Sequence, residues 1–254
     1  MPASSPPLAW LAPGQAFPPA NQAWDTETSA PGLLAAGGAL DVESLCLAYS
    51  RGIFPWYSDG QPILWWSPNP RMVLNVSDFR LHPSFRKSLA RFVRTEGCEI
   101  RFDSAFEQVI AACAASRPGG HNGTWILPEM IAAYCELHRA GIAHSVEAWI
   151  DGTLAGGLYC VGLGKFVFGE SMFSSVSDAS KIALAALVGF CRENHMHHID
   201  CQQNTRHLAS LGAREIPREV FLEHVASAIA QAGPQWHFEN RYWNHLLPEA
   251  PIAK

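Results

Sequence analysis

The sequence has no long apolar run. Its 254 residues contain no stretch of eighteen or more apolar residues, which is the length that a transmembrane helix needs. The first residues, Met-Pro-Ala-Ser-Ser-Pro-Pro, also lack the positively charged and then apolar order of a signal peptide. We therefore expect a cytoplasmic protein without a membrane partner.

The cysteine spacings of disulfide-rich and zinc-binding proteins are also missing. The seven cysteines are odd in number, and no CxxC pair or Cys/His ligand spacing occurs. We therefore expect reduced thiols and no structural zinc. His195, His197 and His198 lie close together, but at the end of a predicted helix, where histidines complement the helix dipole. We expect no metal and no other cofactor.

An overall excess of basic residues is absent too. The 18 Lys and Arg residues are outnumbered by 23 Asp and Glu residues, which gives a formal net charge of -5 at pH 7. This balance argues against a protein covered in basic surface for nucleic acid, although it allows a local basic patch. Apolar residues, in contrast, are abundant. They make up 48% of the chain, enough for a sizeable core.

Proline distribution divides the chain. Seven of the eighteen prolines fall within residues 1–31, which predicts an irregular arm over residues 1–30. The aromatic and proline-rich stretch that follows, with a turn at Asp59-Gly60, predicts a small N-terminal domain over residues 31–77. Residues 78–247 then form a larger domain, and residues 248–254 form a tail.

The larger domain alternates between helical and extended patterns. Phe85, Leu89 and Phe92 recur at helical spacing, and the Asp151-Gly152 turn between two extended runs is typical of a β-hairpin. We expect helices over residues 83–95, 104–115, 128–140 and 178–194, and strands over residues 144–150, 154–161, 165–172 and 198–202. This order predicts an α+β fold, in which a mixed, mainly antiparallel sheet is flanked by helices.

The most informative polar residues are Asp200 and Gln202, two positions apart in an apolar setting. In a strand this spacing places both side chains on one face. A buried carboxylate is costly unless it is hydrogen-bonded or used in function. The pair is therefore a candidate site, and the alternative is a carboxylate at a strand end whose hydrogen bonds come from backbone amides.

Cys201 lies between these two residues. Strand alternation points its side chain to the opposite face, and no motif supplies a histidine partner, so we reject it as a nucleophile.

A basic segment lies between Asp78 and Glu96. It has five basic residues and no acidic residue, in a chain that is acidic overall. Such an asymmetry is typical of a surface that follows a phosphate backbone, although a charge run is also compatible with an ordinary solvated helix face. The predicted tRNA-binding residues in this segment are Arg80, Arg86, Lys87, Arg91 and Arg94.

Several long motifs, taken together and in order, resemble those of the bacterial leucyl/phenylalanyl-tRNA-protein transferases. They cover roughly residues 31–222. The matching segments are Gly32–Leu40, Tyr49–Trp56, Ile63–Arg71, Gly123–Ile126, His144–Trp149, Gly169–Ser174, Ala179–Lys181, Ile199–Gln202 and Leu208–Ala213.

This resemblance implies a GNAT-like acyltransferase fold for the second domain. It also implies transfer of Leu or Phe from leucyl-tRNA or phenylalanyl-tRNA to the N-terminal α-amine of proteins that begin with Arg or Lys, which tags them for degradation. An apolar pocket that accepts Leu and Phe is expected to tolerate Met as well.

The resemblance also implies roles for individual residues. Asp200 and Gln202 occupy the family's catalytic position, where Asp200 serves as a base or as an electrostatic anchor. Glu170, on the neighbouring strand among apolar residues, is a further candidate catalytic residue: its carboxylate would orient either the α-amino group of the aminoacyl residue or the cationic N-terminus of the acceptor, and the alternative is a surface acid on an edge strand. Thr205 stands where some members carry an asparagine, with Asn204 one residue earlier, so this role is open. The aminoacyl pocket is expected to include Trp56, Trp125, Leu158, Val167 and Met172.

Two other functions are compatible with parts of the pattern. An acetyl-CoA N-acetyltransferase of the same fold would need a glycine-rich loop at a helix N-terminus to hold a pyrophosphate. Residues 170–178 occupy that place without a glycine, which disfavours CoA. A non-catalytic module that binds a tRNA 3' end would keep the basic segment and the pocket, but it would not need Asp200 and Gln202.

Overall fold

The structure is a computed structural model that describes residues 7–115 and 126–247. A small sheet forms the N-terminal part, with strand order β1-β2-β4-β3. Helix α1 (Val42–Ser50) begins at Asp41, whose side chain accepts a hydrogen bond from the Ser44 backbone N–H as an N-cap does. The strands of this sheet are β1 (Ala9–Leu11), β2 (Leu33–Gly37), β3 (Phe54–Pro55) and β4 (Leu64–Trp66).

A seven-stranded sheet forms the centre of the larger part, in the order β11-β5-β10-β9-β8-β7-β6. All its neighbouring pairs are antiparallel except β10 and β9, which are parallel. The α+β class and the mixed, mainly antiparallel sheet are therefore confirmed. The strands are β5 (Arg71–Asn75), β6 (Cys98–Phe102), β7 (Ala143–Ile150), β8 (Thr153–Leu163), β9 (Phe166–Ser174), β10 (His198–Gln202) and β11 (Arg214–Ile216).

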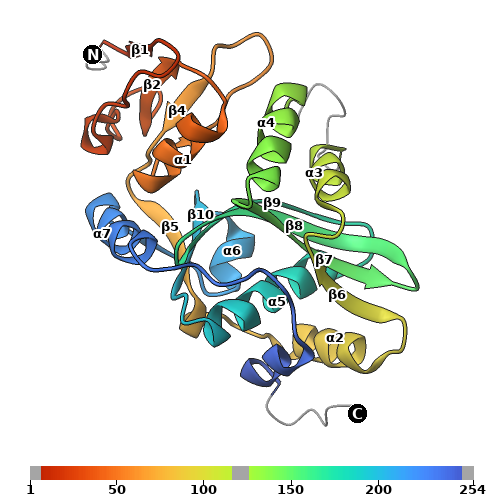
Figure 1. Ribbon diagram of the computed structural model, residues 1–254. Coiled ribbons are helices and arrows are strands. Elements are labelled where there is room, and N and C mark those ends of the chain that lie inside the picture. Colours follow the sequence, from red (N-terminus) through yellow and green to blue (C-terminus); the bar gives the residue numbers. More distant parts are fainter. Residues whose placement is uncertain (1–6, 116–125, 248–254) are drawn as a thin grey trace.

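Helices cover both faces of the large sheet (Figure 1). Helices α3 (Phe106–Ala115) and α4 (Pro128–Arg139) pack on one face, in a core that continues into α1 and the small sheet. Helices α2 (Pro83–Arg94) and α5 (Ala179–Glu193) pack on the other face, in a second core. The remaining helices of residues 7–115 and 126–247 are the short α6 (Arg206–Ser210), α7 (Arg218–Ile229) and the 3-10 segments η1 (Ala20–Gln22), η2 (Val76–Asp78) and η4 (Asn240–His245).

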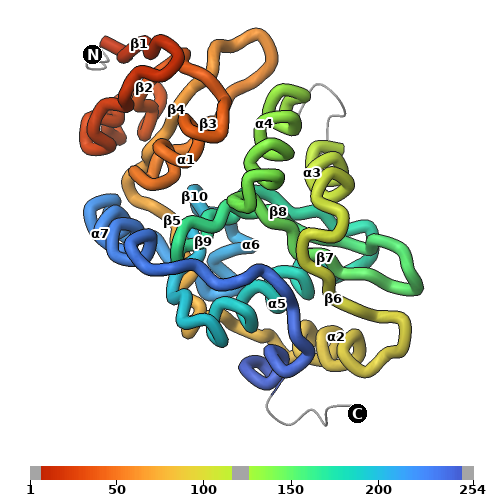
Figure 2. The backbone as a smooth tube through the Cα atoms, viewed as in Figure 1, coloured from red at the N-terminus to blue at the C-terminus, as the bar shows by residue number. Residues whose placement is uncertain are grey.

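The N-terminal arm is partly regular. Strand β1 pairs in parallel with β2, and Phe17 packs edge-on against Trp65 with 4.7 Å between the ring centroids. Figure 2 shows the arm lying at one end of the molecule, next to the small sheet and away from α2. No helix of the described residues is both long and apolar enough to cross a membrane.

Strand β5 connects the two parts. It follows the small sheet in the sequence, but it pairs with β10 and β11 of the large sheet. The expected boundary after residue 77 thus falls beyond the point where the chain changes sheets. This position matters for the site, because β5 begins with Arg71, which contacts β10.

Candidate active site

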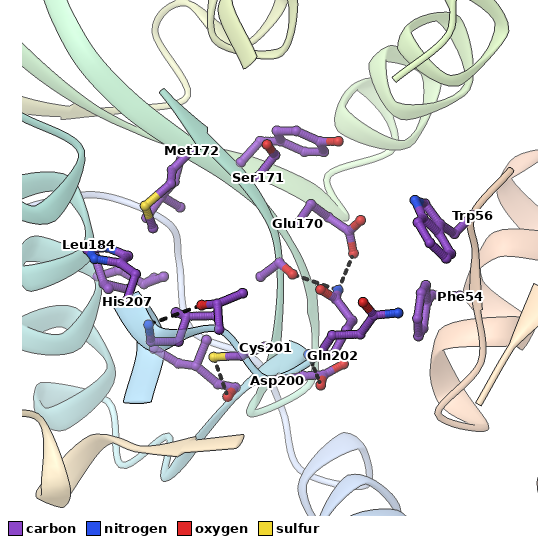
Figure 3. A pocket seen from close by; sticks show the side chains of 18 of the residues that line it. Phe54, Trp56, Glu170, Ser171, Met172, Leu184, Asp200, Cys201, Gln202 and His207 are labelled. Carbon is purple, nitrogen blue, oxygen red and sulfur yellow. Dashed lines mark hydrogen bonds between the residues drawn. The ribbon is translucent and has the colours of Figure 1, made fainter. Parts of the chain in front are cut away.

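A cavity of about 410 Å³ lies where the small sheet meets the large one. Its size is in the usual range for small-molecule sites. Figure 3 shows Phe54 and Trp56 on one side, Leu184 and His207 on the other, and Glu170, Asp200 and Gln202 between them. The cavity therefore combines apolar walls with a group of polar side chains from β9 and β10.

The strand pairing explains why the cavity is there. Strands β9 and β10 pair only through Val167 with Ile199 and Phe168 with Asp200. The residues that follow on the two strands, Gly169–Met172 and Cys201–Gln203, line the cavity instead. The place where these parallel strands stop pairing is thus the place where a ligand can enter the sheet.

Asp200 is held by a buried ion pair. Its carboxylate accepts hydrogen bonds from Arg71 Nε at 2.8 Å and Arg71 Nη2 at 2.6 Å, and both side chains are 0% exposed. The Gln202 backbone N–H donates to Asp200 Oδ1 at 2.9 Å. A two-point contact of this kind fixes the orientation of both groups. Asp200 is therefore already fully paired within the protein.

The guanidinium of Arg71 has further contacts that hold it in place. It donates from Nη1 to the Gly52 carbonyl at 3.3 Å, and it lies over the rings of Phe54 and Phe221, 4.8 and 4.5 Å from their centroids. Such stacking is favourable for a desolvated guanidinium. Arg71 thus links the small-sheet segment, α7 and β10.

Gln202 sits on a distorted part of β10. The pairing of β10 with β5 shifts register between Asp200 and Gln202, and Gln202 has a φ of 54°, in the left-handed region that is rare for residues with a side chain. Its Nε2 donates to the Gly169 carbonyl at 2.6 Å and to Glu170 Oε1 at 3.1 Å. These two bonds fix the amide, with Oε1 as its remaining acceptor.

Glu170 is enclosed by hydroxyl groups. Tyr49 from α1 donates to its Oε1 at 2.7 Å and Tyr134 from α4 donates to its Oε2 at 3.3 Å, and the two phenol oxygens are also in contact with each other. The pKa of Glu170 is raised to about 8, mainly because the carboxyl group is buried; the Tyr49 hydrogen bond opposes this rise and the Asp200 charge adds to it. Near neutral pH this carboxyl group therefore holds a proton in most molecules.

The structure brings together most of the residues expected for the aminoacyl pocket. Trp56, Leu158 and Met172 line the cavity, and Trp56 is 38% exposed. Val167 does not line it, because its side chain is fully buried in the core under α2 and α5. Trp125 lies outside the described residues.

Cys201 lines the cavity beside Gln202. Its side chain packs against the core under α2 and α5, whereas Asp200 pairs with Arg71, which lies over Phe54 and Phe221 of the other core. The expected opposite orientation of Cys201 and Asp200 is therefore confirmed, although Cys201 also reaches the cavity. Burial, followed by the Asp200 charge, raises the pKa of the Cys201 thiol to about 12. The thiol therefore stays protonated and is a poor nucleophile.

The basic residues predicted for tRNA lie on or just before α2, and none of them lines the cavity. All five side chains are exposed, whereas Phe85, Leu89 and Phe92 face the core. Among the described residues, no group of three or more His, Cys, Asp or Glu side chains is arranged to hold a metal ion.

The sequence matches two family models along most of its length. Residues 73–226 match the family described as leucyl/phenylalanyl-tRNA protein transferase, and residues 38–69 match the description of its N-terminal domain. The chain belongs to the leucyl/phenylalanyl-tRNA protein transferase family. The family resemblance expected from the motifs is confirmed.

Curated members of the family are similar over nearly the whole chain. The transferase of Albidiferax ferrireducens is 67% identical over 251 residues, which cover 98% of this chain and 99% of that protein. The transferase of Burkholderia pseudomallei (strain 668) is 54% identical over 97% of this chain and 96% of that protein. Both carry the name leucyl/phenylalanyl-tRNA--protein transferase.

Solved structures show weaker similarity. FemX is 9% identical, with a TM-score of 0.45, over 69% of this chain and 66% of that chain. A GCN5-related N-acetyltransferase from Kribbella flavida is 9% identical, with a TM-score of 0.34, over 67% of this chain and 59% of that chain.

In this family member the site is divided between the two matched regions. Tyr49, Phe54 and Trp56 come from the N-terminal region, while Glu170 and Gln202 come from the main region. Arg71 lies between the two. Neither region alone therefore contains the complete set of contacts.

Four residues of this candidate site were not predicted from the sequence. Arg71, Tyr49, Tyr134 and His207 were not singled out, although Arg71 precedes the apolar run Met-Val-Leu of β5. A cation beside a buried strand needs an anionic partner, and Asp200 in another apolar strand needs a cation. The need of each buried charge for a partner could therefore have predicted the Arg71–Asp200 ion pair. The two tyrosines offered no such signal, since a buried tyrosine is ordinary in a core.

Proposed function

We propose that this protein transfers Leu or Phe, and also Met, from aminoacyl-tRNA to the N-terminal α-amine of proteins that begin with Arg or Lys. Family membership supports the reaction type. The observation that carries the proposal is the apolar cavity with the Gln202 amide and the Glu170 carboxyl group at its wall. Proteins labelled in this way would then be recognised for degradation.

The reaction makes limited chemical demands. An aminoacyl ester is already activated, and an α-amine has a pKa of about 8, so little free energy is needed to supply the neutral amine. The nitrogen attacks the ester carbonyl carbon, the C–N bond forms, and the bond from that carbon to the ribose 3'-oxygen breaks. The amine loses one proton and the departing 3'-oxygen gains one. No cofactor is needed to balance these changes.

Gln202 is the residue that we assign to the attacking amine. Its Nε2 is committed to Gly169 and Glu170, so its Oε1 is the acceptor for an amine N–H. An amide oxygen that accepts this hydrogen bond orients the nitrogen lone pair and stabilises the positive charge that develops during attack. Gln202 therefore positions the nucleophile without acting as a strong base.

Asp200 fits the anchor role better than the role of a base. Both of its oxygens already accept hydrogen bonds from Arg71, and it receives the Gln202 backbone N–H. A carboxylate whose two oxygens are occupied by these hydrogen bonds is poorly placed to reach the substrate amine. We assign Asp200 to holding the distorted turn of β10 that presents Gln202.

The apolar part of the cavity would hold the transferred side chain. Leu158, Met172, Leu184 and Leu187 line it, with Trp56 at the small-sheet side. Burying a Leu or Phe side chain is worth about 1.5–3 kcal/mol, and one methylene changes this by about 1–3 kcal/mol at most. Met is therefore accepted, and Ile and Val are disfavoured by branching at Cβ.

Aminoacyl-tRNA as a substrate also indicates a cellular compartment and a binding surface on the protein. Aminoacyl-tRNAs are made and used in the cytoplasm, which is the compartment that we propose. Their phosphates are assigned to the exposed cations of α2, which contact backbone and not base edges. Such contacts suit an enzyme that accepts several leucine and phenylalanine tRNAs.

A transfer assay tests the proposal. Labelled leucine from leucyl-tRNA is expected to appear on a model protein that starts with Arg or Lys, and not on the same protein starting with Met. Equal labelling of all three proteins, or labelling of none, would overturn the assignment. Acetyl transfer from acetyl-CoA would instead support the acetyltransferase alternative.

A variant of Gln202 separates the enzyme from a tRNA-binding module. We expect Gln202→Ala to lower kcat by about 100-fold, as loss of a positioned group does, while leucyl-tRNA still binds. Gln231→Ala, at an exposed position two residues beyond the end of α7, is the matched control and should transfer leucine normally. Unchanged kcat in Gln202→Ala would contradict the role given to this amide.

A further inference from the structure

Helix α2 and the cavity are connected by the first turn of α5. Asp178, just before α5, accepts a hydrogen bond from Lys181 Nζ at 2.9 Å. The hydrogen bond from Lys181, and then one from Ser88 of α2, lower the pKa of the Asp178 carboxyl group, and the nearby charge of Arg91 contributes as well. The exposed face of α2 thus reaches the start of α5 at Asp178.

The same turn extends to the cavity. His207, on α6, lines the cavity wall (Figure 3). Leu184, three residues after Lys181 on the same side of α5, lines the cavity next to His207, so Lys181 lies about one helical turn from this part of the wall. Desolvation and then the positive charge of Lys181 lower the pKa of His207. Arg206, beside it, is exposed. Arg91, Lys181 and His207 thus supply cationic or N–H-donating groups on three elements, the surface helix α2, the first turn of α5 and the cavity wall at α6.

We propose that Lys181 and His207 bind the phosphodiester backbone of the last nucleotides of the tRNA 3' end, between the surface of α2 and the cavity. The inference rests on the proposed function, since it places the aminoacyl end in the cavity. A positively charged groove that follows the backbone is the usual way to hold a single strand. Lys181 gives one of its three N–H donors to Asp178, and two remain for a phosphate.

The two residues contribute differently. The Lys181 side chain is 36% exposed, and a lysine that neutralises a phosphate displaces a counterion from it. His207 is mostly neutral at pH 7.5, because its pKa is lowered, so it offers a hydrogen bond without displacing a counterion. Salt dependence therefore distinguishes the two contacts.

The test compares two substrates that differ only in having phosphates. The KM for leucyl-tRNA and the KM for 3'-O-leucyl-adenosine, which has no phosphate, are measured over a range of salt concentrations. One lost phosphate contact to a single strand lowers the slope of log affinity against log salt by about 0.7. At about 0.15 M salt this slope corresponds to about a fourfold change in affinity.

We expect Lys181→Gln to raise the KM for leucyl-tRNA by about fourfold more than the KM for leucyl-adenosine, and to reduce the salt slope by about 0.7. His207→Ala should raise the KM for leucyl-tRNA without changing the slope. Lys181→Arg keeps the charge and should keep the slope. Lys165→Gln, at the β8–β9 turn, removes the same charge elsewhere and should leave both KM values unchanged.

Two results would overturn the inference. One is an unchanged salt slope in Lys181→Gln, and the other is an equal rise in KM for both substrates, which would mean a general disturbance of the cavity. Failure of the wild-type protein to use leucyl-tRNA at all would instead refute the proposed function. The two failures are therefore distinguishable in one set of assays.

Discussion

At the scale of single residues, Glu170 has the most unusual environment of the site. Two tyrosine hydroxyls and the Gln202 amide surround its carboxyl group, and burial raises its pKa to about 8. The folded protein therefore holds this proton between about pH 4.5 and 8, where an unfolded glutamate has lost it. The free energy of unfolding should consequently fall as pH rises across this interval, by at most about 1.4 kcal/mol per pH unit from this group.

The variant Glu170→Gln tests this linkage. The amide carries no titrating proton, so urea unfolding at pH 5, 6.5 and 8 should show a smaller loss of stability with rising pH than the wild type shows. Glu107→Gln, on a side chain that is 72% exposed, is the matched control and should keep the wild-type pH dependence. An identical dependence in Glu170→Gln would contradict the raised pKa.

The ion pair of Arg71 and Asp200 makes a second prediction. Removal of one partner leaves a buried charge unpaired, so Arg71→Met should lower the free energy of unfolding by about 3–5 kcal/mol. The double variant Arg71→Met/Asp200→Asn should lose less than Arg71→Met alone, because no charge then remains buried. Chemical denaturation of the three proteins measures this difference. A double variant less stable than the single one would show that the pair is not the main interaction.

The sequence identified Asp200, Gln202 and Glu170 as unusual, but it did not identify their partners. The spacing of Asp200 and Gln202 within one apolar strand was enough to make them candidates. Arg71 is 129 positions from Asp200 and Tyr49 is 121 positions from Glu170. Contacts over such separations depend on the complete strand order, which local patterns do not contain.

At the scale of helices and strands, the sequence correctly predicted the elements that depend on residues close together in the chain. The Asp151-Gly152 turn correctly predicted the hairpin of β7 and β8, and the apolar spacing of residues 83–95 correctly predicted α2. The register shift in β10 and the pairing of β5 with the large sheet were not predicted. Both depend on neighbouring strands that are distant in the sequence, so tertiary contacts decided them.

The exposed face of helix α2 is predicted to bind the phosphates of tRNA. If its exposed face binds phosphates, Arg86→Glu/Lys87→Glu should raise the KM for leucyl-tRNA and should reduce the salt slope by about 1.4–1.8, the value for two lost contacts. Stability should change little, because both side chains are exposed. The salt dependence of transfer kinetics measures the effect.

A control variant changes the net charge of the protein by the same amount as Arg86→Glu/Lys87→Glu. Arg139→Glu/Lys165→Glu reverses two charges on α4 and on the β8–β9 turn, outside the proposed tRNA surface. It should leave the salt slope as in the wild type. If both double variants change the slope equally, the effect comes from net charge and not from a defined surface.

At the scale of the whole molecule, the small sheet and the large sheet share one core. Trp65 of β4 and Phe106 of α3 belong to the same buried cluster. The two parts should therefore unfold together. Trp65→Ala, which removes a fully buried side chain, should destabilise the protein by about 3–5 kcal/mol, with one transition in which tryptophan fluorescence and far-UV circular dichroism coincide.

The matched control is Trp10→Ala. This tryptophan is also in the small sheet, but it is 67% exposed, so its loss should change stability by no more than about 0.5 kcal/mol. A Trp65→Ala protein with two separate transitions would show that the parts unfold independently.

The Tyr49–Glu170 contact has a consequence for the order in which the protein is made. Ribosomes release the chain from its N-terminus, so α1 and Tyr49 leave the ribosome long before β9 and β10. Gln202 is the last residue of β10, and His207 follows it. The contacts among Tyr49, Glu170 and Gln202 can therefore form only after residue 202, about four fifths of the way along the chain, has left the ribosome. If this site carries the proposed transfer, a nascent chain cannot perform it until strand β10 has joined its central sheet.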